Sequence, residues 1–153
     1  MALLEHKIPP PIVALFFIVC MWLVSSIGPQ FDLPLLLGRA LTIGITLVGV
    51  VIPIAGTIAF RKAQTTINPL KPEQASSLVT SGVFQISRNP MYLGMSLVLV
   101  AWAISLSSVL ALCLVPGFML YITRFQIQPE ERALTAVFGE EFDAYRKSVR
   151  RWL

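Results

Sequence analysis

Residues 89–123 read NPMYLGMSLVLVAWAISLSSVLALCLVPGFMLYIT, an uncharged stretch of 35 residues. One helix of that length, at ~1.5 Å per residue, would extend well beyond the ~30 Å hydrocarbon core of a bilayer. The stretch is long enough for two shorter helices, and residues 105–108 have the polarity of a tight turn. We therefore predict a helical hairpin, with one helix at about 91–105 and the other at about 108–125.

Two further uncharged stretches precede the hairpin, residues 8–31 with 24 residues and residues 40–60 with 21. Mostly apolar runs of ~18 residues or more are typical of membrane spans. Only 13% of the chain is charged, against roughly 25% in a soluble domain. The sequence predicts an all-α integral membrane bundle, residues 1–153 as one domain, with four transmembrane helices at about 11–27, 35–60, 91–105 and 108–125.

Two polar segments accompany the predicted spans. Residues 61–90 form a loop of nearly thirty residues, and loops of that length in a compact domain are usually functional. In residues 126–153, Pro129 suits a first helical position and apolar residues recur every three or four positions, as in an amphipathic helix. We predict a cofactor loop at 61–90 and an amphipathic cytoplasmic helix at 129–152 that lies on the membrane surface.

The distribution of Lys and Arg predicts the orientation in the membrane. Lys7, the 61–90 loop and the C-terminal tail are basic, whereas the two short turns carry no Lys or Arg. By the positive-inside rule both termini are expected in the cytoplasm, in a bacterial inner membrane or a eukaryotic endoplasmic reticulum. The basic residues lie at the ends of apolar runs, which argues against a nucleic-acid-binding patch.

The chain offers few groups for metal or nucleophilic chemistry. His6 is the single histidine, and Cys20 and Cys113 lie inside apolar runs. Structural zinc sites need about four N, S or O ligands, and catalytic triads need a histidine beside the nucleophile. We predict no metal site and a chemistry that needs neither thiolate nor imidazole.

The hairpin predicts where polar groups converge. Its two open ends place Arg88 and Arg124 at the same membrane face, next to Glu130 and Glu131 and near the aromatic ring of Tyr92. Cations, carboxylates and an aromatic ring together can hold a zwitterionic ligand with an aromatic part.

Three motifs around the hairpin are LVTSGVF at 78–84, RNPMYLG at 88–94 and PEERALTAVFGEEFDAYRKSV at 129–149. In this order they resemble the isoprenylcysteine carboxyl methyltransferase and phospholipid methyltransferase family. The resemblance covers about residues 65–152. Members of that family are integral membrane enzymes that use S-adenosylmethionine and release S-adenosylhomocysteine.

The resemblance implies roles for individual residues. Arg88 and Arg124 are the candidate catalytic residues, expected to hold an anionic group of cofactor or substrate. Gln126 stands where isoprenylcysteine enzymes carry a substrate-facing arginine, which leaves open whether Arg124 or Gln126 faces the substrate. The expected cofactor contacts are Ser76, Ser77, Leu78, Val79, Phe84, Asn89, Pro90, Met91, Tyr92 and Glu130.

The resemblance also implies an activity, namely methyl transfer from S-adenosylmethionine to a lipidic or amphipathic acceptor in the bilayer. An isoprenylcysteine-type carboxylate is the expected acceptor, and a phospholipid amine or a small thiol are the alternatives. The expected partners are the lipid bilayer and a hydrophobic or prenylated acceptor, with no nucleic acid. A membrane scaffold or subunit that keeps the fold without catalysis is the alternative of a different class.

Overall fold

A computed structural model describes residues 7–64 and 76–153, and these residues form a helical bundle. Within them the only β-type pairing is an isolated bridge between Gln30 and Ser108, so the predicted all-α class is confirmed for this part of the chain. The helices are α1 (Pro10–Ser25), α2 (Leu35–Lys62), the 3₁₀ helix η3 (Gly82–Gln85), α3 (Pro90–Ser105), α4 (Val109–Ile122), the π-helical turn η4 (Thr123–Ile127), α5 (Gln128–Phe138) and α6 (Glu140–Ser148).

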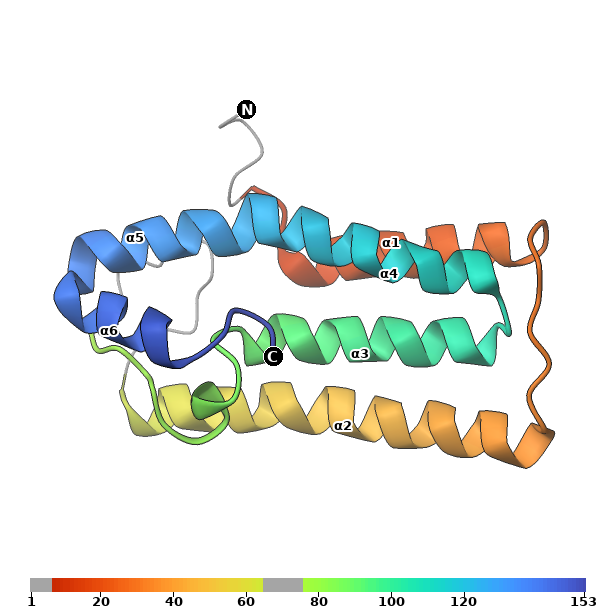
Figure 1. The fold of residues 1–153 in the computed structure, drawn as a ribbon, viewed down its shortest axis with the longest axis horizontal. Helices are drawn as coiled ribbons and strands as arrows, with labels where there is room; N and C mark the ends of the chain where they lie inside the picture. The colour runs from red at the N-terminus through yellow and green to blue at the C-terminus, as the bar shows by residue number, and fades with distance from the viewer. Residues whose placement is uncertain (1–6, 65–75) are drawn as a thin grey trace.

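The four apolar helices lie side by side, with α3 between α2 and the α1–α4 pair (Figure 1). Helix α2 packs closely on α3 because two glycines meet between them. A Cβ atom on Gly94 would collide with the ring of Pro53 and lie 2.5 Å from the carbonyl oxygen of Gly49. Small residues allow this close backbone approach between helices in apolar surroundings.

The 89–123 stretch forms the predicted hairpin. Helix α3 ends at Ser105 and α4 begins at Val109, with Ser107 at a positive φ of 49° in the turn. The Ser108 side chain caps α4 by accepting a hydrogen bond from the backbone N–H of Ala111 at 3.2 Å. This cap satisfies one of the backbone donors that a helix start leaves unpaired.

The C-terminal segment differs from the single helix predicted at 129–152. Helix α5 continues α4 through the π-helical turn, and the chain then breaks at Gly139, whose φ is 52°. Glycine adopts a positive φ at little cost, and Gly139 thereby lets the chain reverse. As a result α6 folds back beside the bundle, and the last residues return to the start of α3 (Figure 1).

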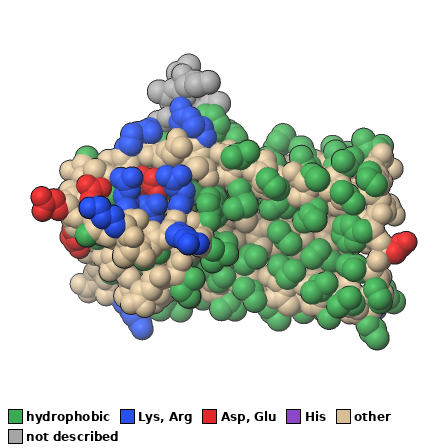
Figure 2. Space-filling model, in the orientation of Figure 1, with side chains coloured by type: hydrophobic (Ala, Val, Ile, Leu, Met, Phe, Trp, Pro, Cys, Tyr) green, Lys and Arg blue, Asp and Glu red, His purple; other side chains and the backbone are tan. Residues whose placement is uncertain are grey.

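The surface divides into an apolar part and a charged part. Lys, Arg, Asp and Glu side chains gather at the end formed by α5 and α6, while hydrophobic side chains cover most of the remaining face (Figure 2). Two of the described helical stretches are long and apolar enough to cross a membrane, Leu35–Lys62 and Val109–Phe138, and α1 and α3 are shorter apolar helices. These features suggest association with a membrane.

Candidate functional site

The site is centred on a hydrogen bond between two helices at the charged end of the bundle. Pro90 occupies the first turn of α3 and Tyr92 follows it, while Glu130 lies in the first turn of α5. The hairpin brings these turns together, and the Tyr92 hydroxyl donates to Oε1 of Glu130 at 2.6 Å. The Tyr92 side chain belongs to the buried core, and the hydrogen bond itself is partly buried, so this bond lies at the edge of the core.

The surroundings shift the ionisation of Glu130, which lies in the polar α5 beyond the apolar part of the bundle. Burial raises the pKa of the Glu130 carboxyl to about 8, and the charge of Glu131 acts in the same direction. The hydrogen bond from Tyr92 opposes this shift because it stabilises the carboxylate. A positively charged ligand beside Glu130 would favour its ionised form further.

A second cluster lies next to this pair and joins Arg88, Glu131 and Arg151. Arg88 Nη1 is 3.1 Å from Glu131 Oε1, and Arg151 forms a two-pronged pair with both oxygens of Glu131 at 3.0 and 2.7 Å. Burial lowers the pKa of Arg88 although Glu131 opposes the shift, and the hydrogen bonds to Glu131 raise the pKa of Arg151. The cluster carries two cations for one carboxylate, so it has a net positive charge.

The chain end fixes the loop before α3. The backbone N–H of Arg88 donates to the carbonyl of Arg150 at 3.0 Å, and the Asn89 side chain donates to the carbonyl of Arg151 at 2.9 Å. Trp152 Nε1 reaches Thr123 Oγ1 at 3.3 Å. Residues 149–153, which we name the C-terminal strap, therefore connect the Asn89 corner with the end of α4.

Five of the predicted contacts lie in or beside a separate apolar cluster. Val79 and Phe84 are buried against Phe142 and Tyr145 of α6, with Leu78 packed beside them. The Tyr145 hydroxyl donates to the carbonyl of Phe84 at 2.6 Å, and burial raises the pKa of Tyr145 to about 12. The hydroxyls of Ser76 and Ser77 donate to carbonyls at the end of α2, those of Gln64 and Ala63.

The two residues proposed to face a substrate lie in the π-helical turn. Arg124 places its guanidinium carbon 5.4 Å from the centroid of the Phe125 ring. Gln126 is 1% exposed, and its Nε2 donates to the carbonyl of Ile8 at 2.8 Å. Its Oε1 is buried without a hydrogen-bond partner among the described residues. A π-helical turn inside a helix often marks a functional site.

The structure thus brings Tyr92 and Glu130 into direct contact. Arg88 joins this site through its ion pair with Glu131, and Asn89 through its hydrogen bond to the Arg151 carbonyl. Pro90 and Met91 complete the first turn of α3, whereas Arg124 lies in the π-helical turn with its guanidinium over the Phe125 ring. Sequence reasoning placed Glu131 among the converging polar groups but did not pair it with Arg151. No local pattern could have paired residues 20 positions apart, because their contact depends on the reversal at Gly139.

Comparison with known proteins agrees with this architecture. Residues 37–141 match the family described as phospholipid methyltransferase. An uncharacterized protein of Haemophilus influenzae is 46% identical over 63 residues, which are 41% of this chain and the whole length of that protein. No solved structure is similar enough to be matched. The chain belongs to the phospholipid methyltransferase family, which is a family of methyltransferases.

The side chains at this site fit the cofactor that the family implies. S-adenosylmethionine carries a sulfonium, an ammonium and a carboxylate. The Glu130 carboxylate can hold a cationic group, and Arg88 Nε, buried without a hydrogen-bond partner among the described residues, can donate to an anionic one. Among the described residues no group of three or more His, Cys, Asp and Glu could hold a metal ion, and His6 lies outside them.

Proposed function

We propose that this protein transfers a methyl group from S-adenosylmethionine to a lipidic or amphipathic acceptor at a membrane. The observation that carries the proposal is the Tyr92–Glu130 hydrogen bond of 2.6 Å beside the net-positive Arg88–Glu131–Arg151 cluster. A carboxylate and an unpaired arginine donor at adjoining positions suit a zwitterionic ligand. The family supports methyl transfer as the reaction class.

We further propose a four-span arrangement with both termini in the cytoplasm. Helices α1 and α3 have 16 residues each, about 24 Å at ~1.5 Å per residue. They lie beside α2, which has 28 residues, and the 30-residue helical stretch Val109–Phe138 that begins with α4 (Figure 1). The charged end that holds the site then faces the cytoplasm, where the water-soluble cofactor is available. The acceptor enters from the bilayer.

Each group at the site has a role in this mechanism. When bound, S-adenosylmethionine would supply an electrophilic methyl group for in-line transfer to the acceptor, with S-adenosylhomocysteine as the leaving group. Glu130, oriented by Tyr92, holds a cationic part of the cofactor, and Arg88 holds its carboxylate. The buried first turn of α3 excludes water. Positioning of this kind is worth up to about 7–11 kcal/mol in favourable cases.

The methyl acceptor could be a carboxylate, as the isoprenylcysteine enzymes would suggest, a neutral amine or a small thiol. A carboxylate substrate needs a cation to bind it. Both candidate arginines already have other contacts, Arg88 with Glu131 and Arg124 with the Phe125 ring. The buried Oε1 of Gln126 accepts hydrogen bonds and cannot flip away, because Nε2 must face the Ile8 carbonyl. Because this Gln126 oxygen accepts hydrogen bonds, it favours a substrate that carries an N–H group, and hence an amine as the methyl acceptor. A thiol is the third alternative.

Ligand-dependent thermal unfolding in detergent tests the proposal. S-adenosylhomocysteine at ~100 times its dissociation constant should stabilise the protein by about 2.7 kcal/mol. Glu130→Gln should abolish the shift while the protein stays folded, and Glu140→Gln, an exposed acid of α6, should leave it unchanged. The absence of a shift in the wild type would favour a non-catalytic scaffold, and a full shift in Glu130→Gln would discard the role of Glu130.

A further inference from the structure

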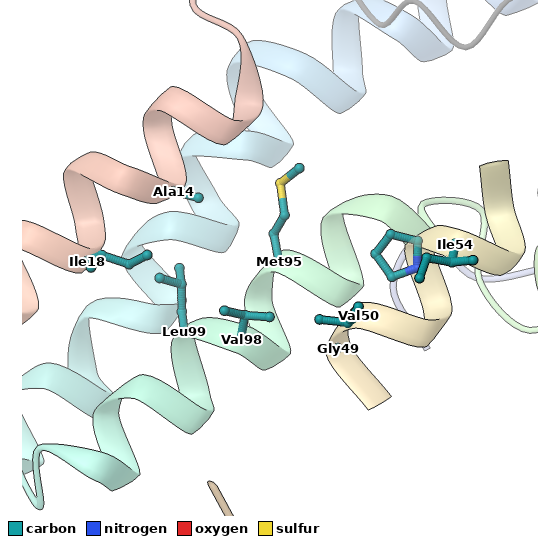
Figure 3. Close-up of a pocket in the computed structure, with 9 residues that line it drawn as sticks. Ala14, Ile18, Gly49, Val50, Ile54, Met95, Val98 and Leu99 are labelled. Carbon is teal, nitrogen blue, oxygen red and sulfur yellow. The ribbon is translucent and has the colours of Figure 1, made fainter. Parts of the chain in front are cut away.

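A groove runs between α1 and α2 because these two helices pack on other elements. Helix α2 packs on α3 and η3, whereas α1 packs on α3 and α4. The floor of the groove is α3, and a cavity of about 310 Å³ opens there. Figure 3 shows its side chains coming from all three helices. The lining is apolar and includes Ala14, Ile18, Val50, Pro53, Met95 and Val98.

A second cavity of about 290 Å³ lies farther along α2, at the end of the molecule away from the Tyr92–Glu130 pair. Polar groups line it, namely Arg39, Thr42, Ser105 and Ser107, together with apolar side chains such as Ile43. Arg39 is the only Lys or Arg in residues 8–60. No described residue forms an ion pair or a hydrogen bond with its guanidinium. The cavity therefore joins a cation without a counter-charge to an apolar wall.

The two cavities lie on one face of α2. Their α2 residues recur at intervals of three and four, with Leu35, Arg39 and Thr42 at the second cavity and Val50 and Pro53 at the first. Such spacing marks one side of an α-helix. From Arg39 to Pro53 the helix rises about 21 Å, which is about half of the ~40–45 Å thickness of a bilayer with its headgroups.

We propose that this groove binds one anionic phospholipid of the leaflet opposite the methyl-transfer site. Its phosphate lies at Arg39 with the Thr42 and Ser107 hydroxyls, and one acyl chain follows α2 into the cavity between α1 and α3. Charge complementarity selects the headgroup, since Arg39 has no counter-ion among residues 7–64 and 76–153. Asp32, the other charge at this end, does not line the cavity. The inference rests on the four-span arrangement proposed above, but not on the catalytic activity.

Lipid retention tests the inference. The full chain is purified in mild detergent, incubated separately with phosphatidylglycerol and phosphatidylcholine, repurified, and its bound lipid is quantified by mass spectrometry. We expect about one phosphatidylglycerol per chain and several-fold less phosphatidylcholine. Arg39→Gln should lower phosphatidylglycerol retention several-fold, and Arg39→Lys should preserve most of it. Lys62→Gln, at the other end of α2, is the matched control and should retain the lipid.

Ala14→Phe tests the part of the groove that would hold the acyl chain. The added ring would fill the apolar cavity and should also lower lipid retention. Wild-type retention by Arg39→Gln, or equal retention of the two lipids, would overturn the proposal. The melting shift with S-adenosylhomocysteine, measured on the same preparations, separates the two hypotheses. The melting shift should persist in Arg39→Gln. If the wild type shows no shift but lipid retention still depends on Arg39, the proposed enzymatic function is wrong and the proposed lipid site is supported.

Discussion

Glu130 and Tyr92 lie 38 positions apart in sequence and share a hydrogen bond of 2.6 Å. Tyr92 donates to the carboxylate, and in the same region Arg88 contributes a buried Nε with no partner among the described residues. The Arg88 Nε therefore has a hydrogen bond left to make. A polar group buried without a hydrogen bond costs about 1–3 kcal/mol. This cost is recovered when a ligand supplies the missing partner.

The raised pKa of Glu130 predicts a pH dependence of cofactor binding. The folded pKa is about 8, so most of the protein carries a neutral Glu130 at pH 6–7. A cationic ligand binds the ionised form, and its affinity should increase between pH 6 and 8, by at most about tenfold per pH unit. Equilibrium binding of S-adenosylmethionine measured by calorimetry checks this. Glu130→Gln should bind weakly with a flat profile; an unchanged slope in that variant would assign the titration to another group.

At the scale of elements, the close contact of α2 and α3 depends on Gly94. An added Cβ would meet Pro53 and the Gly49 carbonyl, and such overpacking costs typically about 1–3 kcal/mol. We expect Gly94→Ala to lower the melting temperature of the detergent-solubilised protein. Gly44→Ala is the control, since a Cβ there meets nothing within 4 Å. Equal melting temperatures for the two variants would contradict the packing described for α2 and α3.

The C-terminal strap gives a second prediction at this scale. Arg151→Gln removes both bonds to Glu131, and the strap should then loosen from the Asn89 corner. Hydrogen–deuterium exchange should become faster at the amide of Arg88, which donates to the Arg150 carbonyl. Arg150→Gln removes an exposed side chain and should leave the exchange unchanged. Identical protection in Arg151→Gln would mean that the backbone bonds alone fix the strap.

The sequence predicted the helices of the apolar stretches well, because long uncharged runs and a Ser-rich turn are local signals. It predicted one helix where α5 and α6 form two, since apolar spacing alone does not reveal that Gly139 adopts a positive φ. The family motifs pointed to Tyr92 and Glu130, which the structure brings into contact. Glu131, Arg151 and the orphan oxygen of Gln126 depend on tertiary contacts that no local pattern encodes.

At the scale of the whole molecule, charge and apolar surface are separated along the bundle. The charged end carries the Tyr92–Glu130 pair and the C-terminal strap, while exposed apolar side chains cover much of α1 and α2. Figure 2 shows this division on one face. Such a molecule can meet a water-soluble donor at one end and a lipid-borne acceptor along its side. Membership of the phospholipid methyltransferase family supports this arrangement as the setting for methyl transfer.

The most direct test of the account is methyl transfer by the purified protein. The protein is incubated with radiolabelled S-adenosylmethionine and, in parallel, with a total lipid extract and a panel of prenyl-cysteine analogues. The account predicts label in a lipid-soluble product with the wild type and with Glu140→Gln, and almost none with Glu130→Gln. No label in any acceptor, or the same label with Glu130→Gln as with the wild type, would contradict it.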